Sequence, residues 1–557
     1  MIPLVFGLAL VLGAAGGSAN KRKQPNVLLI VADDQGHAQV GYHNASTLTP
    51  RIDALAAGGI TLENYYVQPV CSPTRSVLMT GRYTNRLGTQ ATVIRADVPF
   101  GVPLDNTFLP QNLQDAGYVT ALFGKWHLGF YQRAYTPLAR GFDEHLGYFE
   151  GEVDYVTHVG GGYAGTRKGV DWHRGNSTTC FEDGGTWTED LIVAESLSFL
   201  HRMAAAQQQA APKAAKPFFL YYPLHLIHGP NEAPQRFLDL FPERNLSATA
   251  ASYGMCGVCQ CKDQRSGDFA PSDVSWGACR TVLAMTAALD WAVGEVVDGL
   301  KDSGLYDDTI IIYTSDNGAQ PGQGGTNAPL RGWKTQLYEG GVRVPGFVHS
   351  PLLPAAAQGT VHHGLFHASD WLPTIARGIA GGDTSRNLPL DGYDIWPALT
   401  GGPDTPSPRN ELLHNINAAC HLGYVFPNAG LRVGDMKLLV DCFNYTTMAP
   451  TGLVELYNIS ADPYELTNMA ADPDMAGTVA SMVAKLKAYA AQADQVPPTL
   501  FPEKAPKHAQ PGIKPGYYQC PQCSQGNAVC DHAGGRGALG CRLDPWCDDV
   551  VCSEDEP

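Results

Sequence analysis

The segment around Cys71 has residue types that suit a reactive or modified cysteine. Pro73, Arg75 and Gly81 follow Cys71, and no simple structural role explains a cysteine with this spacing. Pro73 favours the first turn of a helix and Gly81 favours its end, so we expect Cys71 at a helix amino terminus. Unpaired N–H groups and the helix dipole favour an anion there, and Arg75 adds a cation. The alternative is a buried structural or disulfide-bonded cysteine.

Four side chains with oxygen donors follow two apolar, β-branched segments, residues 26–32 and 309–315. They are Asp33, Asp34, Asp316 and Asn317. Such runs are typical of strands covered on both faces in a parallel sheet, and open α/β sheets place polar chemistry just past strand ends. Because hard oxygen donors select Ca²⁺ or Mg²⁺ over zinc or copper, the four predict a metal site. Either pair alone would more simply be a turn or a helix cap.

Four basic side chains supply cations and proton carriers. They are Lys125, His127, His228 and Lys334. The first two follow an expected strand at 118–123, and His228 follows another at 218–222. A lone His or Lys in a loop is usually solvated or a packing partner, but positions after predicted strands, together with the Cys71 segment, favour a functional role.

The elements that must position these residues alternate between strands and helices, which predicts an α/β fold with a large, mostly parallel sheet. A helix is clearest at 280–300, before Gly304. From about residue 406 the pattern changes to short strand-like pieces and a helix at 479–491, which predicts a smaller antiparallel sheet. The expected organisation is a signal peptide (1–20), a main domain (24–405), a sheet-plus-helix subdomain (406–500) and a cysteine-rich tail (501–557).

The composition of the 557 residues, 44% hydrophobic and 17% charged, allows a large buried core. The net charge of −16 argues against general binding to nucleic acid or to an anionic membrane surface. Any anion must therefore be recognised locally.

The amino terminus indicates export. Residues 2–16 are apolar and are followed by the small residues 17–19, which suits a signal peptide. The run is shorter than the roughly 20 residues of a spanning helix, and a short anchor is the alternative. Five patterns for N-glycosylation agree with export, at Asn44, Asn176, Asn245, Asn444 and Asn458. We expect a secreted protein or one in a lysosome-like compartment.

The 14 cysteines are most simply disulfide-bonded in an exported chain, and Cys420 and Cys442 form a plausible pair. Two cysteine groups could also be written as zinc ligands. They are Cys256, Cys259 and Cys261, and Cys520, Cys523 and Cys530 with His532. Disulfides are favoured for both groups because the chain is expected in an oxidising compartment.

These segments resemble the type I sulfatases. Residues 71–82 are similar to the family signature C-x-P-x-R followed by an apolar pair and T-G-R, and the similarity extends from Pro25 to about residue 500. The resemblance is closest to the arylsulfatase B (N-acetylgalactosamine-4-sulfatase) branch, through residues 31–34, 54–59, 124–129, 329–332, 339–343, 369–373 and 411–415. It implies an alkaline-phosphatase-like sandwich in which the main domain is a sulfatase catalytic domain.

The resemblance also implies two cofactors. A formylglycine-generating enzyme would oxidise Cys71 to Cα-formylglycine during maturation, and one Ca²⁺ would be bound beside it. The implied ligands are residue 71 with Asp33, Asp34, Asp316 and Asn317. The metal and nearby cations would neutralise a sulfate group.

Catalytic roles follow from the same resemblance. Arg75 would steady the hydrated aldehyde, Lys125 would neighbour it, and Lys334 would bind sulfate oxygens. One hydroxyl of the hydrate would attack sulfur while His228, with Lys334, protonates the leaving alcohol. His127 would then take the proton of the second hydroxyl, which expels sulfate.

Expected substrates are sulfate esters of sugars, with aryl sulfates as artificial ones. One alternative is a phosphoesterase of the related alkaline phosphatase architecture, but such enzymes usually bind two metals and use an unmodified Ser or Thr. The other alternative is a secreted, catalytically silent glycan-binding protein. It would lack an acting residue, and none of the six is lost: Cys71, Arg75, Lys125, His127, His228 and Lys334.

Overall fold

The computed structural model describes most of the chain between residues 24 and 492. The described ranges are 24–96, 98–160, 169–178, 183–210, 214–242, 276–417, 425–444, 447 and 449–492. The expected signal peptide, the cysteine-rich tail, Cys420 and the two groups of possible zinc ligands lie outside these residues. Cys442 and Cys279 are each disulfide-bonded, whereas Cys71 is a free thiol.

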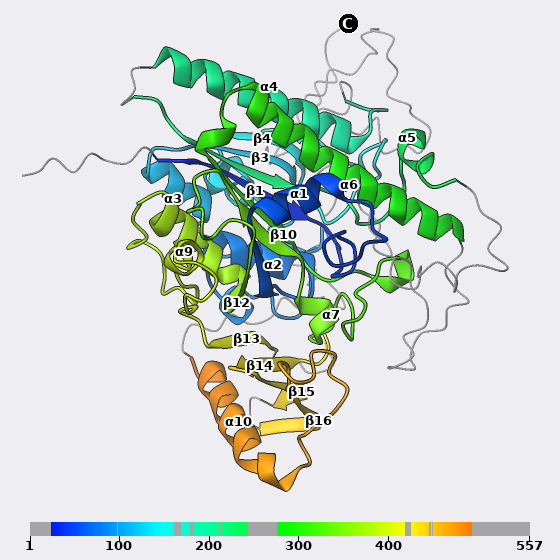
Figure 1. Ribbon diagram of the computed structural model, residues 1–557, viewed down its shortest axis with the longest axis vertical. Coiled ribbons are helices and arrows are strands. Elements are labelled where there is room, and N and C mark those ends of the chain that lie inside the picture. The colour runs from blue at the N-terminus through cyan, green and yellow to red at the C-terminus, as the bar shows by residue number, and fades with distance from the viewer. Residues whose placement is uncertain are drawn as a thin grey trace, which may run out of the picture.

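The larger sheet has ten strands within the described residues (Figure 1). In spatial order they are β12 (Thr360–His367), β2 (Ile60–Tyr66), β11 (Gly346–His349), β10 (Thr309–Ser315), β1 (Asn26–Ala32), β9 (Phe218–Pro223), β3 (Val119–Lys125), β4 (Glu144–Tyr148), β7 (His173–Arg174) and β8 (Ser177–Thr178). The five strands from β10 to β4 are parallel, while β11, β7 and β8 run antiparallel to their neighbours. The predicted α/β fold with a mostly parallel sheet is confirmed.

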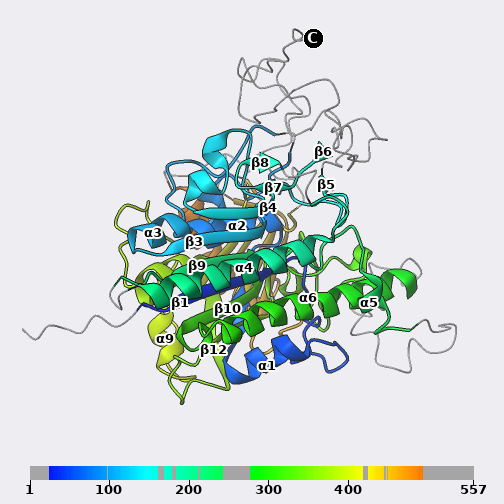
Figure 2. The ribbon, with the colours of Figure 1, turned by 90° about the horizontal axis from the view of Figure 1, so that it is seen from above.

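Helices cover both faces of this sheet, with α4 and α6 on one side and α2 and α3 on the other (Figures 1 and 2). The helices are α1 (Pro50–Gly58), α2 (Cys71–Thr80), α3 (Leu109–Asp115), α4 (Thr188–Gln209), α5 (Gln235–Leu238), α6 (Trp276–Asp302), α7 (Glu339–Val342), α8 (Trp371–Pro373), α9 (Trp396–Thr400) and α10 (Ala476–Ala490). Alternate residues of β1 enter the two cores: Leu28 and Ile30 pack toward α4 and α6, whereas Val27 and Leu29 pack toward α2 and α3. This two-sided burial explains why the strand has no polar alternation.

The expected elements match the observed ones closely. β1 and β10 have the predicted bounds, β3 starts one residue later and ends at Lys125, and β9 continues to Pro223. The helix expected at 280–300 is α6, which begins earlier and ends before Gly304 at φ 68°. Among the described residues, no helix is long and apolar enough to cross a membrane.

A second sheet lies beside the first and packs against α10 (Figure 1). Within the described residues it has four antiparallel strands, β13 (Glu411–Ile416), β14 (Ala429–Val433), β15 (Met436–Asn444) and β16 (Ala449–Asn458). Its core includes Leu438 and Leu456 together with Tyr66, Val70 and Cys71 of the larger unit. The second sheet therefore supports the backbone that carries Cys71. A short ribbon of β5 (Val159–Gly160) and β6 (Gly169–Val170) is separate.

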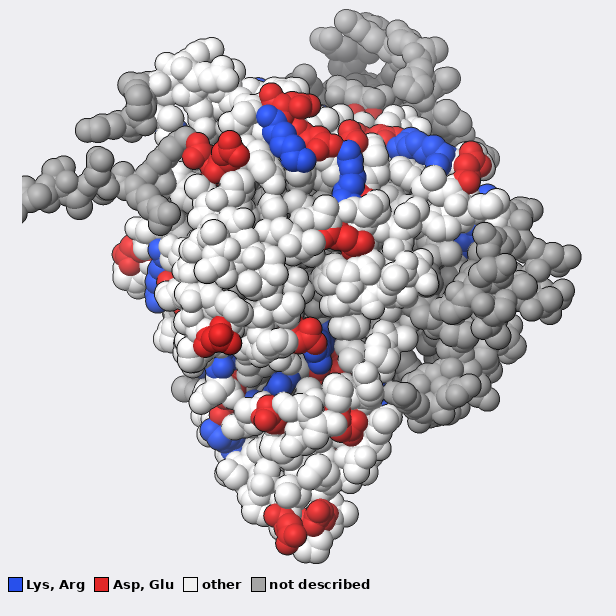
Figure 3. All heavy atoms as spheres, in the orientation of Figure 1, with Lys and Arg blue, Asp and Glu red and all other residues white. Residues whose placement is uncertain are grey.

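Buried charges join the two sheets. Lys437 on β15 places Nζ 2.8 Å from Glu339 Oε1 at the start of α7 and 2.8 Å from Glu465 Oε1, and all three side chains are buried. Tyr66 donates to Glu339 Oε2 at 2.7 Å. Elsewhere on the face in Figure 3, acidic and basic side chains are scattered among uncharged atoms.

Replacing Lys437 by methionine is expected to lower the free energy of unfolding by about 3 kcal/mol, because among the described residues it leaves buried Glu465 without a cation and Glu339 with Arg343 alone. Urea unfolding followed by intrinsic fluorescence measures the change. The control is Lys485→Met, which removes an ammonium that is 44% exposed and paired with Glu411, and should cost less than about 1 kcal/mol. Equal stability of the two variants would contradict the assignment.

Candidate active site

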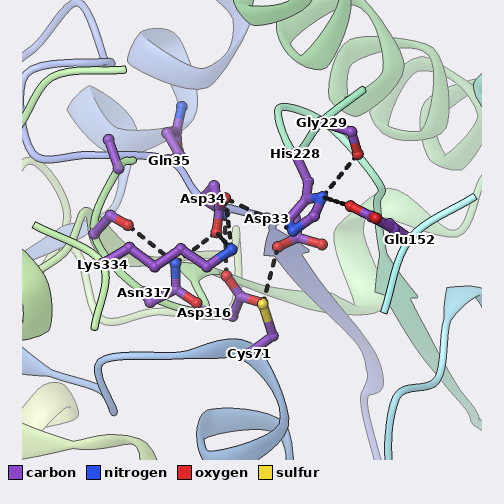
Figure 4. Close-up of polar contacts among 12 residues, drawn as sticks. Asp33, Asp34, Gln35, Cys71, Glu152, His228, Gly229, Asp316, Asn317 and Lys334 are labelled. Carbon is purple, nitrogen blue, oxygen red and sulfur yellow. Dashed lines mark hydrogen bonds and ion pairs between the residues drawn. The ribbon is translucent and has the colours of Figure 1, made fainter. Parts of the chain in front are cut away.

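The carboxyl ends of β1 and β10 bring the four predicted oxygen donors together (Figure 4). Ala32 is the register partner of Ser315, so the residues that follow each strand are neighbours. The Asp34 N–H donates to Asp316 Oδ1 at 3.2 Å, and Asn317 Nδ2 donates to Asp34 Oδ1 at 2.7 Å. Parallel pairing of two buried strands therefore produces a compact group of oxygen atoms.

Cys71 is the first residue of α2, as predicted, and Gly81 ends this helix in the left-handed conformation at φ 67°. Its Sγ lies 3.6 Å from Asp33 Oδ1. The expectation that this position favours an anion is wrong for the thiol itself. Burial raises the pKa of Cys71 above its usual range, although Lys125 and Lys334 oppose the shift. An unmodified Cys71 would therefore remain a neutral thiol.

Arg75 and Lys125 neutralise the carboxylates beneath Cys71. Arg75 Nη2 lies 2.7 Å from Asp316 Oδ2 and 3.4 Å from Asp33 Oδ2, and Lys125 Nζ lies 2.5 Å from Asp33 Oδ2. All four side chains are buried. Burial and the nearby Asp33 still raise the pKa of Asp316 to about 6, against the effect of Arg75 and Lys125.

Lys334 and His228 flank Asp34 on the more open side. Lys334 Nζ lies 2.7 Å from Asp34 Oδ1, and His228 Nε2 lies 3.9 Å from Asp34 Oδ2. Burial alone would raise the pKa of Asp34, but Lys334 and His228 outweigh it and lower that pKa to about 2. Burial and then Lys334 lower the pKa of His228 to about 4, while Asp34 opposes them.

His127 is held as a neutral imidazole with one free nitrogen. Its Nε2 lies 3.0 Å from the Ile94 carbonyl oxygen, so Nε2 carries the proton. Burial, followed by Lys125 and Arg75, lowers the pKa of His127 well below its usual value. Within the described part of the chain, Nδ1 has no hydrogen-bond partner. His127 can therefore accept a proton at Nδ1.

Sequence reasoning did not identify Glu152, which lies beside this group. Its Oε2 is 3.8 Å from His228 Nδ1, and the two face each other in Figure 4. The residue before it, Gly151, packs against His127: a Cβ there would lie 2.7 Å from His127 Cε1. No motif marks either position.

The oxygen donors of this group fit a hard divalent cation. Among the described residues, Asp33, Asp34, Cys71 and His228 bring ligand atoms within 4.8 Å of one another. The predicted set included Asp316 and Asn317 instead of His228. Asn317 Oδ1 is buried with no donor among the described residues, which fits an oxygen ligand that lacks its cation. Both oxygens of Asp316 already accept hydrogen bonds, from Arg75 and from the backbone of Asp34.

Comparisons with known proteins agree with this geometry. A family model described as Sulfatase matches residues 25–379. Arylsulfatase J of Mus musculus is 36% identical over 529 residues, which cover 89% of this chain and 79% of the relative. Arylsulfatase A of Homo sapiens is 32% identical over 418 residues, which cover 72% of this chain and 73% of the relative. N-acetylgalactosamine-6-sulfatase of Canis lupus familiaris is 32% identical, with coverages of 72% and 71%.

Solved structures show the same architecture. The crystal structure of Ps i-CgsB in complex with k-i-k-neocarrahexaose is 27% identical with a TM-score of 0.66, covering 86% of this chain and 95% of that chain. The phosphonate monoester hydrolase of Agrobacterium radiobacter is 23% identical with a TM-score of 0.55, covering 84% and 95%. The second likeness concerns the fold alone.

Next to His225 lies a buried carboxyl group whose titration is separate from that of the carboxylates at the strand ends. Glu189, in the first turn of α4, accepts the N–H of His225 at 3.1 Å and the hydroxyl of Thr188 at 2.5 Å. Burial raises its pKa from 4.5 to about 7. Because the folded state binds this proton more tightly, the stabilisation is complete below about pH 4.5 and is lost as pH rises to about 7.

Glu189→Gln should remove this part of the pH dependence, which amounts to about 3 kcal/mol between these pH values. The measurement is the apparent Tm of both proteins at intervals from about pH 4.5 to about pH 7.5. The apparent Tm of the variant should rise relative to that of the wild type as the pH increases. Glu195→Gln on the same helix is the control, and a wild-type profile parallel to that of Glu189→Gln would contradict the assignment.

Proposed function

Because the chain belongs to the sulfatase family and is a sulfuric ester hydrolase, we propose that its natural substrates are sulfated sugars and that residue 71 acts as Cα-formylglycine beside one Ca²⁺. The observation that carries this proposal is the free, buried Cys71 at the start of α2, enclosed by three carboxylates and three cations. They are Asp33, Asp34, Asp316, Arg75, Lys125 and Lys334.

The charge balance explains why a metal would be needed. The three carboxylates and the three cations cancel, so the chain alone offers no net positive charge to a sulfate ester. Ca²⁺ would supply the positive charge that attracts the sulfate oxygens, and Asp33, Asp34, Asp316, Asn317 and residue 71 would hold it. Lys334, which is more exposed than the other cations, would then contact the sulfate as well as Asp34.

The proton carriers are arranged on two sides of the site. The hydrated aldehyde at position 71 would supply one hydroxyl as the nucleophile and a second hydroxyl whose proton must leave. His127 can take that proton at Nδ1, because Nε2 is bound to the Ile94 carbonyl. Lys334 holds a proton for the leaving alcohol: burial opposes its charge, but Asp34 raises its pKa well above the usual value. His228 Nε2 lies on the same side of Asp34.

A sugar substrate is supported by the names of the relatives. One relative is N-acetylgalactosamine-6-sulfatase, and one similar structure is a complex with a carrahexaose. The proposal that this chain belongs to the arylsulfatase B branch rests on the sequence resemblance alone. The relatives named above are arylsulfatases J and A and the 6-sulfatase. Aryl sulfates would serve as artificial substrates.

We also propose maturation in the secretory pathway, where a formylglycine-generating enzyme would meet the chain before it folds. Burial of Cys71 in the folded structure supports this order, because an enzyme could not reach the thiol after folding. The disulfide-bonded state of Cys279 and Cys442 supports an oxidising compartment.

Mass spectrometry of the tryptic peptide that contains residue 71 tests the modification. Protein from its own secretory pathway should show a mass about 18 Da below that of unmodified cysteine, from oxidation of thiol to aldehyde. Cys71→Ala should lose more than about 1,000-fold in kcat on an aryl sulfate because the nucleophile is absent. Unmodified Cys71 in active protein would refute the mechanism, and phosphatase activity above sulfatase activity would refute the substrate class.

Calcium should raise the apparent Tm of chelator-treated protein. At a Ca²⁺ concentration 100 times Kd, binding adds about 2.7 kcal/mol to the free energy of unfolding. Asp316→Asn should abolish this shift and lower sulfatase activity. The control, Asp307→Asn, changes an exposed side chain that precedes the same strand, β10, and should respond as wild type does. An undiminished calcium response of Asp316→Asn would show that Asp316 is not a ligand.

A further inference from the structure

Exposure of the side chains increases from the buried part of the site around Cys71 toward His228, Lys334 and Glu152. Cys71, Arg75 and Lys125 are buried, and exposure of the side chains rises to 10% at His228 and 14% at Lys334. It reaches 41% at Glu152, which lies next to His228 (Figure 4). Among these residues Glu152 is the most exposed, which places it where the alcohol part of an ester would lie if its sulfate is bound at residue 71.

The position of Glu152 is fixed by its surroundings. It follows Gly151, which packs against the ring of His127 and leaves no space for a Cβ. Glu152 Oε2 lies 3.8 Å from His228 Nδ1, which in turn lies 2.8 Å from the Gly229 carbonyl oxygen. The carboxylate therefore lies close to His228, while the side chain of Glu152 remains 41% exposed to solvent.

Glu152 differs from the other carboxylates of the site in its pairing. Asp33, Asp34 and Asp316 each have a Lys or Arg partner within 3.4 Å. Among the described residues, the basic side chain within 4.0 Å of Glu152 is His228 alone, and it carries no charge unless it is protonated. An anionic group that no lysine or arginine neutralises, at the entrance to an anion-binding site, must act on the part of the substrate that is not sulfate.

We propose that Glu152 determines which sulfate esters the enzyme accepts. Its carboxylate accepts hydrogen bonds from hydroxyl or ammonium groups beside the scissile sulfate, and it repels alcohols that carry a carboxylate or a second sulfate at that place. The inference rests on the proposed function, because the orientation of the substrate follows from sulfate binding at residue 71.

Three aryl sulfates test the inference, namely 3-carbamoylphenyl, 3-carboxyphenyl and 3-(aminomethyl)phenyl sulfate. They place a neutral, an anionic and a cationic group near the entrance. For each charged substrate, the relative value is its kcat/KM divided by that of the 3-carbamoylphenyl ester. Glu152→Gln should raise the relative value of the 3-carboxyphenyl ester about fivefold over that of the wild type. It should lower the relative value of the 3-(aminomethyl)phenyl ester by a similar factor. Comparing each substrate between variant and wild type cancels its intrinsic reactivity.

Glu152→Lys should change both relative kcat/KM values in the same directions and by larger factors. Salt at about 1 M should reduce these changes because it screens the charges. Glu144→Gln is the matched control: this side chain is 37% exposed and starts β4, the strand that precedes Glu152. It should leave all three relative values unchanged. Relative values within about twofold of wild type in both Glu152 variants, or equal changes in Glu144→Gln, would overturn the inference. If the wild type hydrolysed none of the three esters, the proposed function itself would be refuted.

Discussion

The pairing of three buried carboxylates with three buried or nearly buried cations determines how this site is built. A buried charge is costly unless a partner of opposite charge and hydrogen bonds compensate it. Asp33 and Asp316 share Arg75, Lys125 completes the pairing of Asp33, and Lys334 pairs with Asp34. These cations come from α2, from the end of β3 and from the loop before α7, so the electrostatics of one small volume require three distant parts of the chain to meet.

The second sheet contributes to this arrangement although it supplies no acting side chain. The Thr335 N–H donates to the Pro69 carbonyl at 2.7 Å, which joins the loop of Lys334 to the segment before Cys71. A few residues later, Glu339 enters the buried charge cluster with Lys437 of β15. The loop that carries Lys334 is therefore held at one end by the segment before Cys71 and at the other by the smaller sheet. Removal of that sheet would release a cation from the site.

Sequence reasoning located the parts of this site that follow regular elements. The bounds of β1 and β10 and the start of α2 could be predicted because uniform apolar runs, Pro73 and Gly81 have few other structural uses. The state of the Cys71 thiol could not, because burial outweighs the helix dipole and the nearby cations, and burial is known only from the fold. Glu152 escaped prediction since it lies on an irregular, partly exposed segment without a pattern.

Positions 151 and 152 differ in the freedom they leave to evolution. A side chain at Gly151 would collide with His127, so a change at this position would displace that imidazole. The next residue faces solvent and pairs with no lysine or arginine among the described residues, so it can be exchanged without breaking the charge balance of the buried group. Under the role proposed for Glu152, a single substitution at this position would change the range of accepted esters and leave the buried residues of the site unchanged.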